Sequence, residues 1–79
     1  MQIENIGSNQ VVVRTGKANV LFSYNTPVAA FVLELRDYVK TKEFYSVTTS
    51  KHINQWLRSK SLDPANVKTV EQDYLDNLV

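Results

Sequence analysis

Residues 44–57, FYSVTTSKHINQWL, mark the point at which strand-like sequence gives way to helical sequence. Three consecutive hydroxyl residues stand at this junction: Thr48, Thr49 and Ser50. Hydroxyl side chains cap the free N–H groups of a helix start, so the junction predicts a helix N-terminus. Downstream, Ile53, Trp56 and Leu57 recur at helical spacing. The predicted helix covers residues 51–59.

Before this junction, apolar residues cluster in short runs between turn formers, a pattern typical of β-strands. The predicted strands cover residues 2–6, 10–14, 18–24 and 28–35, then 38–41 and 44–47 as one bent strand or two. Pro27 cannot donate a hydrogen bond to a sheet, so we expect it at the start of the fourth strand or at a bulge. The two alanines that precede Phe31 predict close packing of bulky groups over the sheet, with the C-terminal helices as the cover.

The last twenty or so residues predict a second short helix. Asp63 followed by Pro64 is typical of an N-cap with Pro in the first helical turn, so this pair predicts one turn of helix at most. Thr69 with Gln72 is a capping-box pattern, and Leu75 lies on the apolar stripe that follows it. The order of the predicted elements, with the strands first and the helices second, is typical of an α+β fold. We expect this fold in a single domain over residues 1–79. Its small antiparallel sheet of four to five strands fills the N-terminal two thirds, and two short C-terminal helices pack on one face.

Length and composition exclude several classes of protein. A chain of 79 residues holds one small core, and folding at this size buries about 60% of the surface that the unfolded chain exposes. The sequence has no cysteine, which excludes disulfides, thiolate nucleophiles and Cys-ligated metal centres. Residues 1–10 lack the features of a signal peptide, and no apolar run is long enough to span a membrane. We therefore expect a soluble protein that stays in the cytoplasm.

The residues that could support catalysis are few. His52 is the only His, and the hydroxyl residues near it are accompanied by no oxyanion feature and no nucleophile elbow. The chain has no Gly-rich loop, and it is too short to enclose a substrate pocket of a few hundred Å³. We therefore expect no catalysis, no metal site, no cofactor and no small-molecule substrate.

Charge divides the chain into a weakly basic body and an acidic tail. Residues 1–60 carry eight Lys or Arg against four Asp or Glu, and residues 61–79 carry one against four. The candidates for contact with an anion or a nucleic acid are polar or basic residues around the first helix: Lys40, Lys42, Thr49, Ser50, Lys51 and Arg58. Tyr45 and Trp56 are candidate exposed aromatics, on which bases could stack. The competing interpretation is that the hydroxyls only cap the helix and that Trp56 belongs to the core.

Two sequence motifs carry a resemblance to a known group of proteins. They are SYNTPVAAF at residues 23–31 and YSVTTSKHINQWL at residues 45–57. The chain resembles a family of small proteins of unknown function that tailed bacteriophages encode and that marine viral metagenomes contain. The resemblance implies a viral or prophage accessory protein in a bacterial host cell, and it implies no particular mechanism.

Protein binding is the function that these features predict. A small sheet with apolar runs such as QVVVR, residues 10–14, and PVAAFVLEL, residues 27–35, exposes at least one edge. Such an edge can pair with a second copy or accept a partner's strand. We therefore expect a small accessory or structural protein that is a homodimer or binds another protein. The alternative is a nucleic-acid-binding protein that uses the basic and aromatic surface around the first helix.

Overall fold

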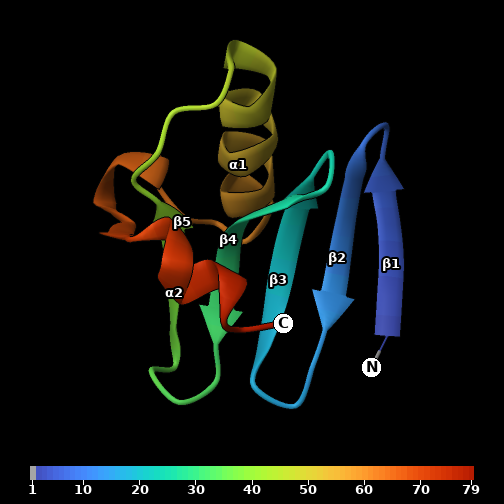
Figure 1. Cartoon of the computed structure of the whole chain (residues 1–79). Coiled ribbons are helices and arrows are strands. Elements are labelled where there is room, and N and C mark those ends of the chain that lie inside the picture. The colour runs from blue at the N-terminus through green and yellow to red at the C-terminus, as the bar shows by residue number, and fades with distance from the viewer. Residues whose placement is uncertain (1) are drawn as a thin grey trace.

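A computed structural model describes residues 2–79, and it contains one six-stranded sheet in the order β1-β2-β3-β4-β5-β6 (Figure 1). The strands are β1 (Gln2–Gly7), β2 (Gln10–Arg14), β3 (Ala18–Ser23), β4 (Thr26–Val32), β5 (Asp37–Thr41) and β6 (Lys68–Val70). The first five strands form an antiparallel meander, and β6 pairs in parallel with β5. The edge strands of this sheet are therefore β1 and β6.

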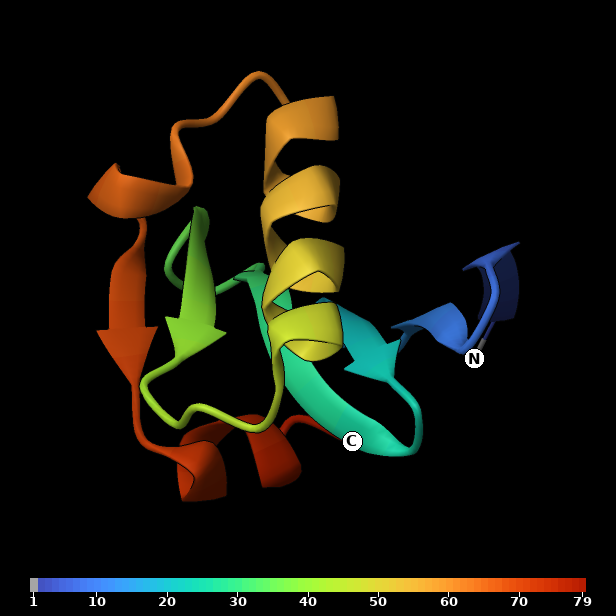
Figure 2. The same ribbon diagram turned by 90° about the horizontal axis from the view of Figure 1, so that it is seen from above.

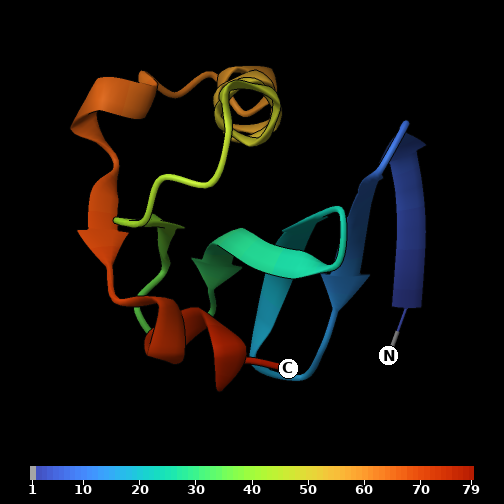
Figure 3. The same cartoon turned by 45° about the horizontal axis from the view of Figure 1, so that its top comes forward.

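Two helices and one 3₁₀ turn complete the fold. Helix α1 (Val47–Ser59) and the turn η1 (Pro64–Asn66) lie in the connection between β5 and β6, and helix α2 (Gln72–Asp76) follows β6. A connection of this length is what a parallel pair of neighbouring strands requires. Figures 2 and 3 show α1 on one side of the sheet and α2 on the other.

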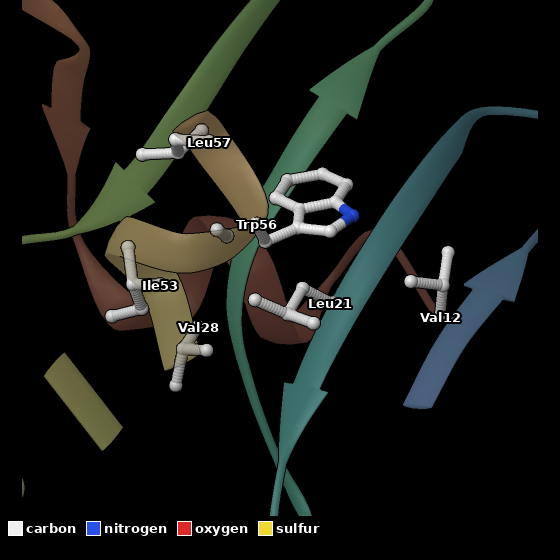
Figure 4. Packing of buried hydrophobic residues seen from close by; sticks show 7 residues of the cluster. Val12, Leu21, Val28, Ile53, Trp56 and Leu57 are labelled. Carbon is white, nitrogen blue, oxygen red and sulfur yellow. The ribbon is translucent and has the colours of Figure 1, made fainter. Parts of the chain in front are cut away.

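The core consists of two hydrophobic clusters, one on each face of the sheet. The cluster under α1 contains Val12, Leu21, Val28, Ala29, Ile53, Trp56 and Leu57, and Figure 4 shows its packing. The cluster under α2 contains Ala18, Val20, Ala30, Val32, Val39, Leu75 and Leu78. Successive residues of a strand point to opposite faces, so Ala29 meets α1 while Ala30 meets α2.

Helix α1 begins four residues before the predicted start. Its N-cap is Ser46, whose Oγ accepts a hydrogen bond from the Thr49 N–H at 3.0 Å. The apolar residues that predicted the helix are buried against the sheet, which confirms the predicted periodicity. Residues 44–46 form a loop and Val47 is helical, so the prediction of a strand over 44–47 is wrong. The Ser46 side chain satisfies the free N–H of Thr49 and so sets the helix start four residues earlier than predicted.

The segment from Lys68 to Val70 is a strand, although the sequence predicted a helix from Thr69. These residues pair with the open side of β5, where Thr69 lies opposite Lys40. The next helix is short, and its N-cap, Glu71, makes no side-chain cap hydrogen bond. Pairing with an available sheet edge has therefore replaced the predicted capping box.

The α+β class is confirmed. Five strands precede the helices, but β6 follows α1 and pairs in parallel with β5, so the sheet is mixed rather than wholly antiparallel. The sheet has six strands rather than four to five, and the helices cover opposite faces rather than one face. The physical reason is the apolar content of β3 and β4, which are buried on both faces and so need a cover on each side. Pro27 lies at the irregularity in the β3–β4 pairing, opposite Phe22, as predicted for a bulge position.

Candidate functional site

Strand β1 is the most exposed element of the structure. All six of its residues are exposed, and it pairs with β2 alone among the described residues. Its two large apolar side chains, Ile3 and Ile6, are 69% and 40% exposed. One backbone edge of β1 therefore has no neighbouring strand, and unpaired N–H and C=O groups at such an edge form a template for pairing with another chain.

The β1–β2 hairpin is held in place by short-range contacts. Asn9, in the turn, has a φ of 59°, a left-handed conformation that Asn tolerates better than most residues. Its carbonyl accepts a hydrogen bond from the Tyr24 N–H at 2.8 Å, which ties this turn to the β3–β4 turn. Glu4 on β1 and Arg14 on β2 form an exposed ion pair at 3.5 Å. The hairpin is thus ordered without contributing any β1 side chain to the core.

A single row of apolar residues crosses the sheet from the core to this open edge. Cross-strand pairing places Ile3, Val13, Val20, Ala30 and Val39 opposite one another in turn. The inner three are fully buried in the cluster under α2. Val13 is half-buried and Ile3 is exposed, because α2 covers only the strands nearer to β5. The apolar face therefore continues past its cover to the edge.

On the opposite face, a hollow of about 270 Å³ lies between the hairpin and α1. Its lining residues are Glu4, Ile6, Gln10, Gln55, Trp56, Ser59 and Lys60. Both faces of β1 are thus open to solvent, and Figure 3 shows β1 standing apart from both helices.

A further hollow, of about 440 Å³, lies between the β2–β3 turn, the β4–β5 turn and α2 with the residues that follow it. Val32, Leu33 and Leu78 form its apolar part, and the charged side chains of Lys17 and Glu34 line it as well. None of its polar lining residues is buried. It lacks the fixed polar groups that orient a small ligand.

The hydroxyl residues at the start of α1 have mostly internal partners. Thr49 is buried, and its Oγ1 lies 3.1 Å from the Ser23 Oγ. Ser23 Oγ also lies 2.8 Å from His52 Nδ1, so three polar side chains form one buried cluster. Ser50 is half-buried, and its N–H donates to the Ser46 carbonyl at 3.0 Å. The cluster fixes α1 to the end of β3, which fits the capping and packing interpretation.

The Ser23–His52 pair resembles part of a catalytic dyad in its distance but not in its surroundings. Ser23 is only 2% exposed, so a substrate has no access to its hydroxyl. Among residues 2–79, no group of three or more His, Asp or Glu side chains could hold a metal ion. None of the helices described is long and apolar enough to cross a membrane.

Two of the basic candidates, Lys40 and Lys42, line a hollow of about 310 Å³ together with Ser50, and each of the two lysines has a protein partner. Lys40 donates from Nζ to the Pro64 carbonyl at 2.7 Å, and Lys42 forms an ion pair with Glu71 at 2.6 Å. That hydrogen-bonded carboxylate raises the pKa of Lys42 above its ordinary value of 10.5. Lys51 and Arg58 are exposed on α1.

The two candidate aromatics differ in exposure. Trp56 is 6% exposed and packs in the cluster under α1, with its ring 5.5 Å from that of Tyr38, so it is a core residue and not an exposed aromatic (Figure 4). Tyr45 is 46% exposed, and its hydroxyl donates to Gln72 Oε1 at 2.7 Å. Partial burial raises the pKa of Tyr45, and the nearby carboxylates of Glu43 and Asp76 add to this effect.

Comparison with known proteins gives a family without a known function. Residues 1–77 match the model of DUF8033, a family of unknown function. The chain belongs to this family. No curated protein and no solved structure matches it. The expected membership in a family of unknown function is thereby confirmed.

Sequence reasoning predicted an open edge but did not assign it to a strand. The two apolar runs that it named, QVVVR and PVAAFVLEL, lie largely in β2 and β4, and both strands are paired on both sides. Ile3 and Ile6 were part of a predicted strand and were given no role. The signal that could have found them is their place in the first strand of a meander, which has a sequence neighbour on one side only.

Proposed function

We propose that this protein is a small accessory or structural protein of the tailed-phage type that acts by protein–protein binding through β1, without catalysis. The observation that carries the proposal is the complete exposure of β1, including Ile3 and Ile6. An extended segment of a partner would add to the sheet beside β1, with main-chain hydrogen bonds giving affinity and side chains giving specificity. The uncovered apolar residues beside the edge would be buried in the same step.

Nucleic-acid binding, the alternative, has less support. It needs basic side chains free to meet phosphates and aromatic rings free to stack. Lys40 and Lys42 have protein partners, and the Trp56 ring lies in the core. The net charge of +1 provides no broad attraction for a polyanion.

Site-specific photocrosslinking tests the proposal. Benzoylphenylalanine replaces Ile3 in one variant and Leu35 in a control variant, because Leu35 is also exposed but lies in the β4–β5 turn. After irradiation in the cells that produce the chain, we expect protein adducts from position 3 and few from position 35. Introducing Asn5→Pro into the position 3 variant should abolish them, since Pro disrupts β1 as a template for pairing.

Equal adduct yields from positions 3 and 35, or none from position 3, would contradict the proposal. Size-exclusion chromatography with light scattering, with and without a short single-stranded DNA, tests the alternative. We expect no change in mass on adding DNA at low or physiological salt. A salt-sensitive shift would favour nucleic-acid binding instead.

A further inference from the structure

We infer that the strand added to β1 is the β1 strand of a second copy of this chain, antiparallel to the first, with the two Ile3 residues opposite each other. This inference rests on the proposed function and names its partner. Two sheets would then join into one continuous sheet across a two-fold axis. Two-fold dimers are the commonest homo-oligomers.

The charge of β1 permits pairing with a copy of itself. Glu4 is the only ionisable side chain in QIENIG, and Arg14 of the neighbouring strand neutralises it. A strand without net charge has no preference for an oppositely charged partner, and it does not repel its own copy. Lys and Pro, two of the devices by which natural edges avoid pairing, are missing from β1, and the irregularity in its pairing with β2 lies at Asn5 to Gly7, beyond Ile3 and Glu4.

Symmetry narrows the choice of register. When a two-fold axis perpendicular to the sheet relates antiparallel strands, one residue of each strand lies opposite its own copy. An axis at Glu4 would place two carboxylates face to face, which is unfavourable. An axis at Asn5 would place Glu4 against Ile6 of the copy. An axis at Ile3 places apolar against apolar and Gln2 against Glu4, where the amide can donate to the carboxylate.

The Ile3 register also completes the apolar row that crosses the sheet. Ile3 lies opposite Val13, and Val13 opposite the buried Val20. Because the axis is perpendicular to the sheet, the same face of the copy continues the row beyond Ile3. The exposed end of each row would be buried against the other, which is the change in apolar exposure that drives association.

No helix stands in the way of this pairing. Figures 2 and 3 show α1 and α2 beside the central and C-terminal strands, with β1 extending away from both. The free side of β1 is the side away from β2, since β1 is the end of the sheet. A second copy can therefore approach along β1 without displacing any described element.

Light scattering after size exclusion is the first test. We expect a mass twice the 9.0 kDa of the chain for the wild type and a single chain mass for Ile3→Lys. The matched control is Leu35→Lys, which adds the same charge at another exposed apolar residue and should stay dimeric. Circular dichroism confirms that each variant is folded. A monomeric wild type, or an Ile3→Lys variant that stays dimeric, would overturn the inference.

A cysteine scan tests the register, and the absence of natural cysteine keeps it free of background. Opposed residues of antiparallel strands have Cα atoms about 4.5 to 5.5 Å apart, within the range of a disulfide. We expect Ile3→Cys to form a covalent dimer under mild oxidation, and Asn5→Cys and Leu35→Cys to form little. Cross-linking at Asn5 but not at Ile3 would overturn the register.

The photocrosslinked adducts separate this inference from the function on which it rests. An adduct at position 3 of twice the chain mass supports both. An adduct of another mass, with a monomeric wild type, would overturn self-pairing and leave protein binding through β1 in place. The absence of any adduct at position 3 would overturn both.

Discussion

Strands β1 and β6 bound the same sheet, but they end it in different ways. β1 has six residues, all exposed, and its apolar side chains include Ile3. β6 has only three residues, begins with Lys68 and is separated from the η1 turn by Val67 alone. Short length and a Lys are two of the means by which natural sheets protect an edge, and β1 uses neither. The difference teaches that this chain protects one edge and leaves the other available.

The surroundings of the two edges reinforce this contrast. Beside β6, the Lys42 N–H donates to the Val70 carbonyl at 2.9 Å, and Lys42 pairs with Glu71. The Gln72 side chain then joins four partners, namely Pro27, Thr41, Tyr45 and Asp76. Among the described residues, the β1 side chains form one ion pair with another strand, that of Glu4 with Arg14, and no hydrogen bond to another element. We therefore expect substitutions on the β6 side to change stability and substitutions on β1 to change association.

The largest expected loss of stability is in the core under α1. Trp56→Ala should lower the free energy of unfolding by about 3 to 5 kcal/mol, since it removes a buried aromatic side chain and leaves a cavity. Urea denaturation followed by circular dichroism measures it, because the variant lacks the only Trp fluorophore. A stability close to that of the wild type would mean that α1 does not depend on this side chain for docking.

Gln72→Ala tests the protected side directly. The side chain satisfies four groups from β4, β5, the following loop and α2, so its removal should cost about 1 to 3 kcal/mol. Gln55→Ala, at an exposed residue of α1, is the matched control and should have little effect. Chemical denaturation measures the free energy of unfolding of both variants. Equal effects would show that the Gln72 network does not hold the β6 side together.

Ser46→Ala tests the start of α1. Loss of the hydrogen bond from the Thr49 N–H should cost about 1 kcal/mol. Thr48→Ala removes a neighbouring exposed hydroxyl and serves as the control. Thermal denaturation compares the two variants. A larger loss of stability in Thr48→Ala than in Ser46→Ala would mean that Ser46 is not the N-cap of α1.

Alkaline pH should weaken the β6 side. The folded state raises the pKa of Lys42, through Glu71, and that of Tyr45, through partial burial. A raised pKa stabilises the fold below the ordinary values of 10.0 for Tyr and 10.5 for Lys, and this contribution is lost as pH rises through the folded-state values. We expect thermal stability to fall above about pH 10. Lys42→Met should make that fall shallower, and an unchanged pH profile would contradict the role of the ion pair.

The smallest expected effect is at β1. Ile3→Ala should change the free energy of unfolding of the single chain by less than about 0.5 kcal/mol, because an exposed side chain has little packing to lose. The measurement needs a dilute sample, since association adds stability to the wild type alone. A loss comparable to that of Trp56→Ala would mean that β1 belongs to the core.

Much of the fold was predictable because it follows from local patterns. The strand over residues 10–14 was predicted with its observed bounds, and the spacing of Ile53, Trp56 and Leu57 indicated both α1 and the side that it buries. The candidate site was less predictable. Its residues depend on which strands pair. The apolar runs QVVVR and PVAAFVLEL drew attention to β2 and β4, and the structure pairs each of these strands on both sides.

By itself, the sequence determined the α+β class, the position of α1 and the presence of Trp56 in its apolar stripe, because periodicity and turn residues act over a few residues. Only the tertiary structure decided that β1 is the open edge, that α1 and α2 cover opposite faces, and that Ser23 meets His52. These outcomes depend on which distant segments pair. Strand pairing depends on competition among all the apolar faces of the chain, so a local sequence pattern does not predict which strands pair.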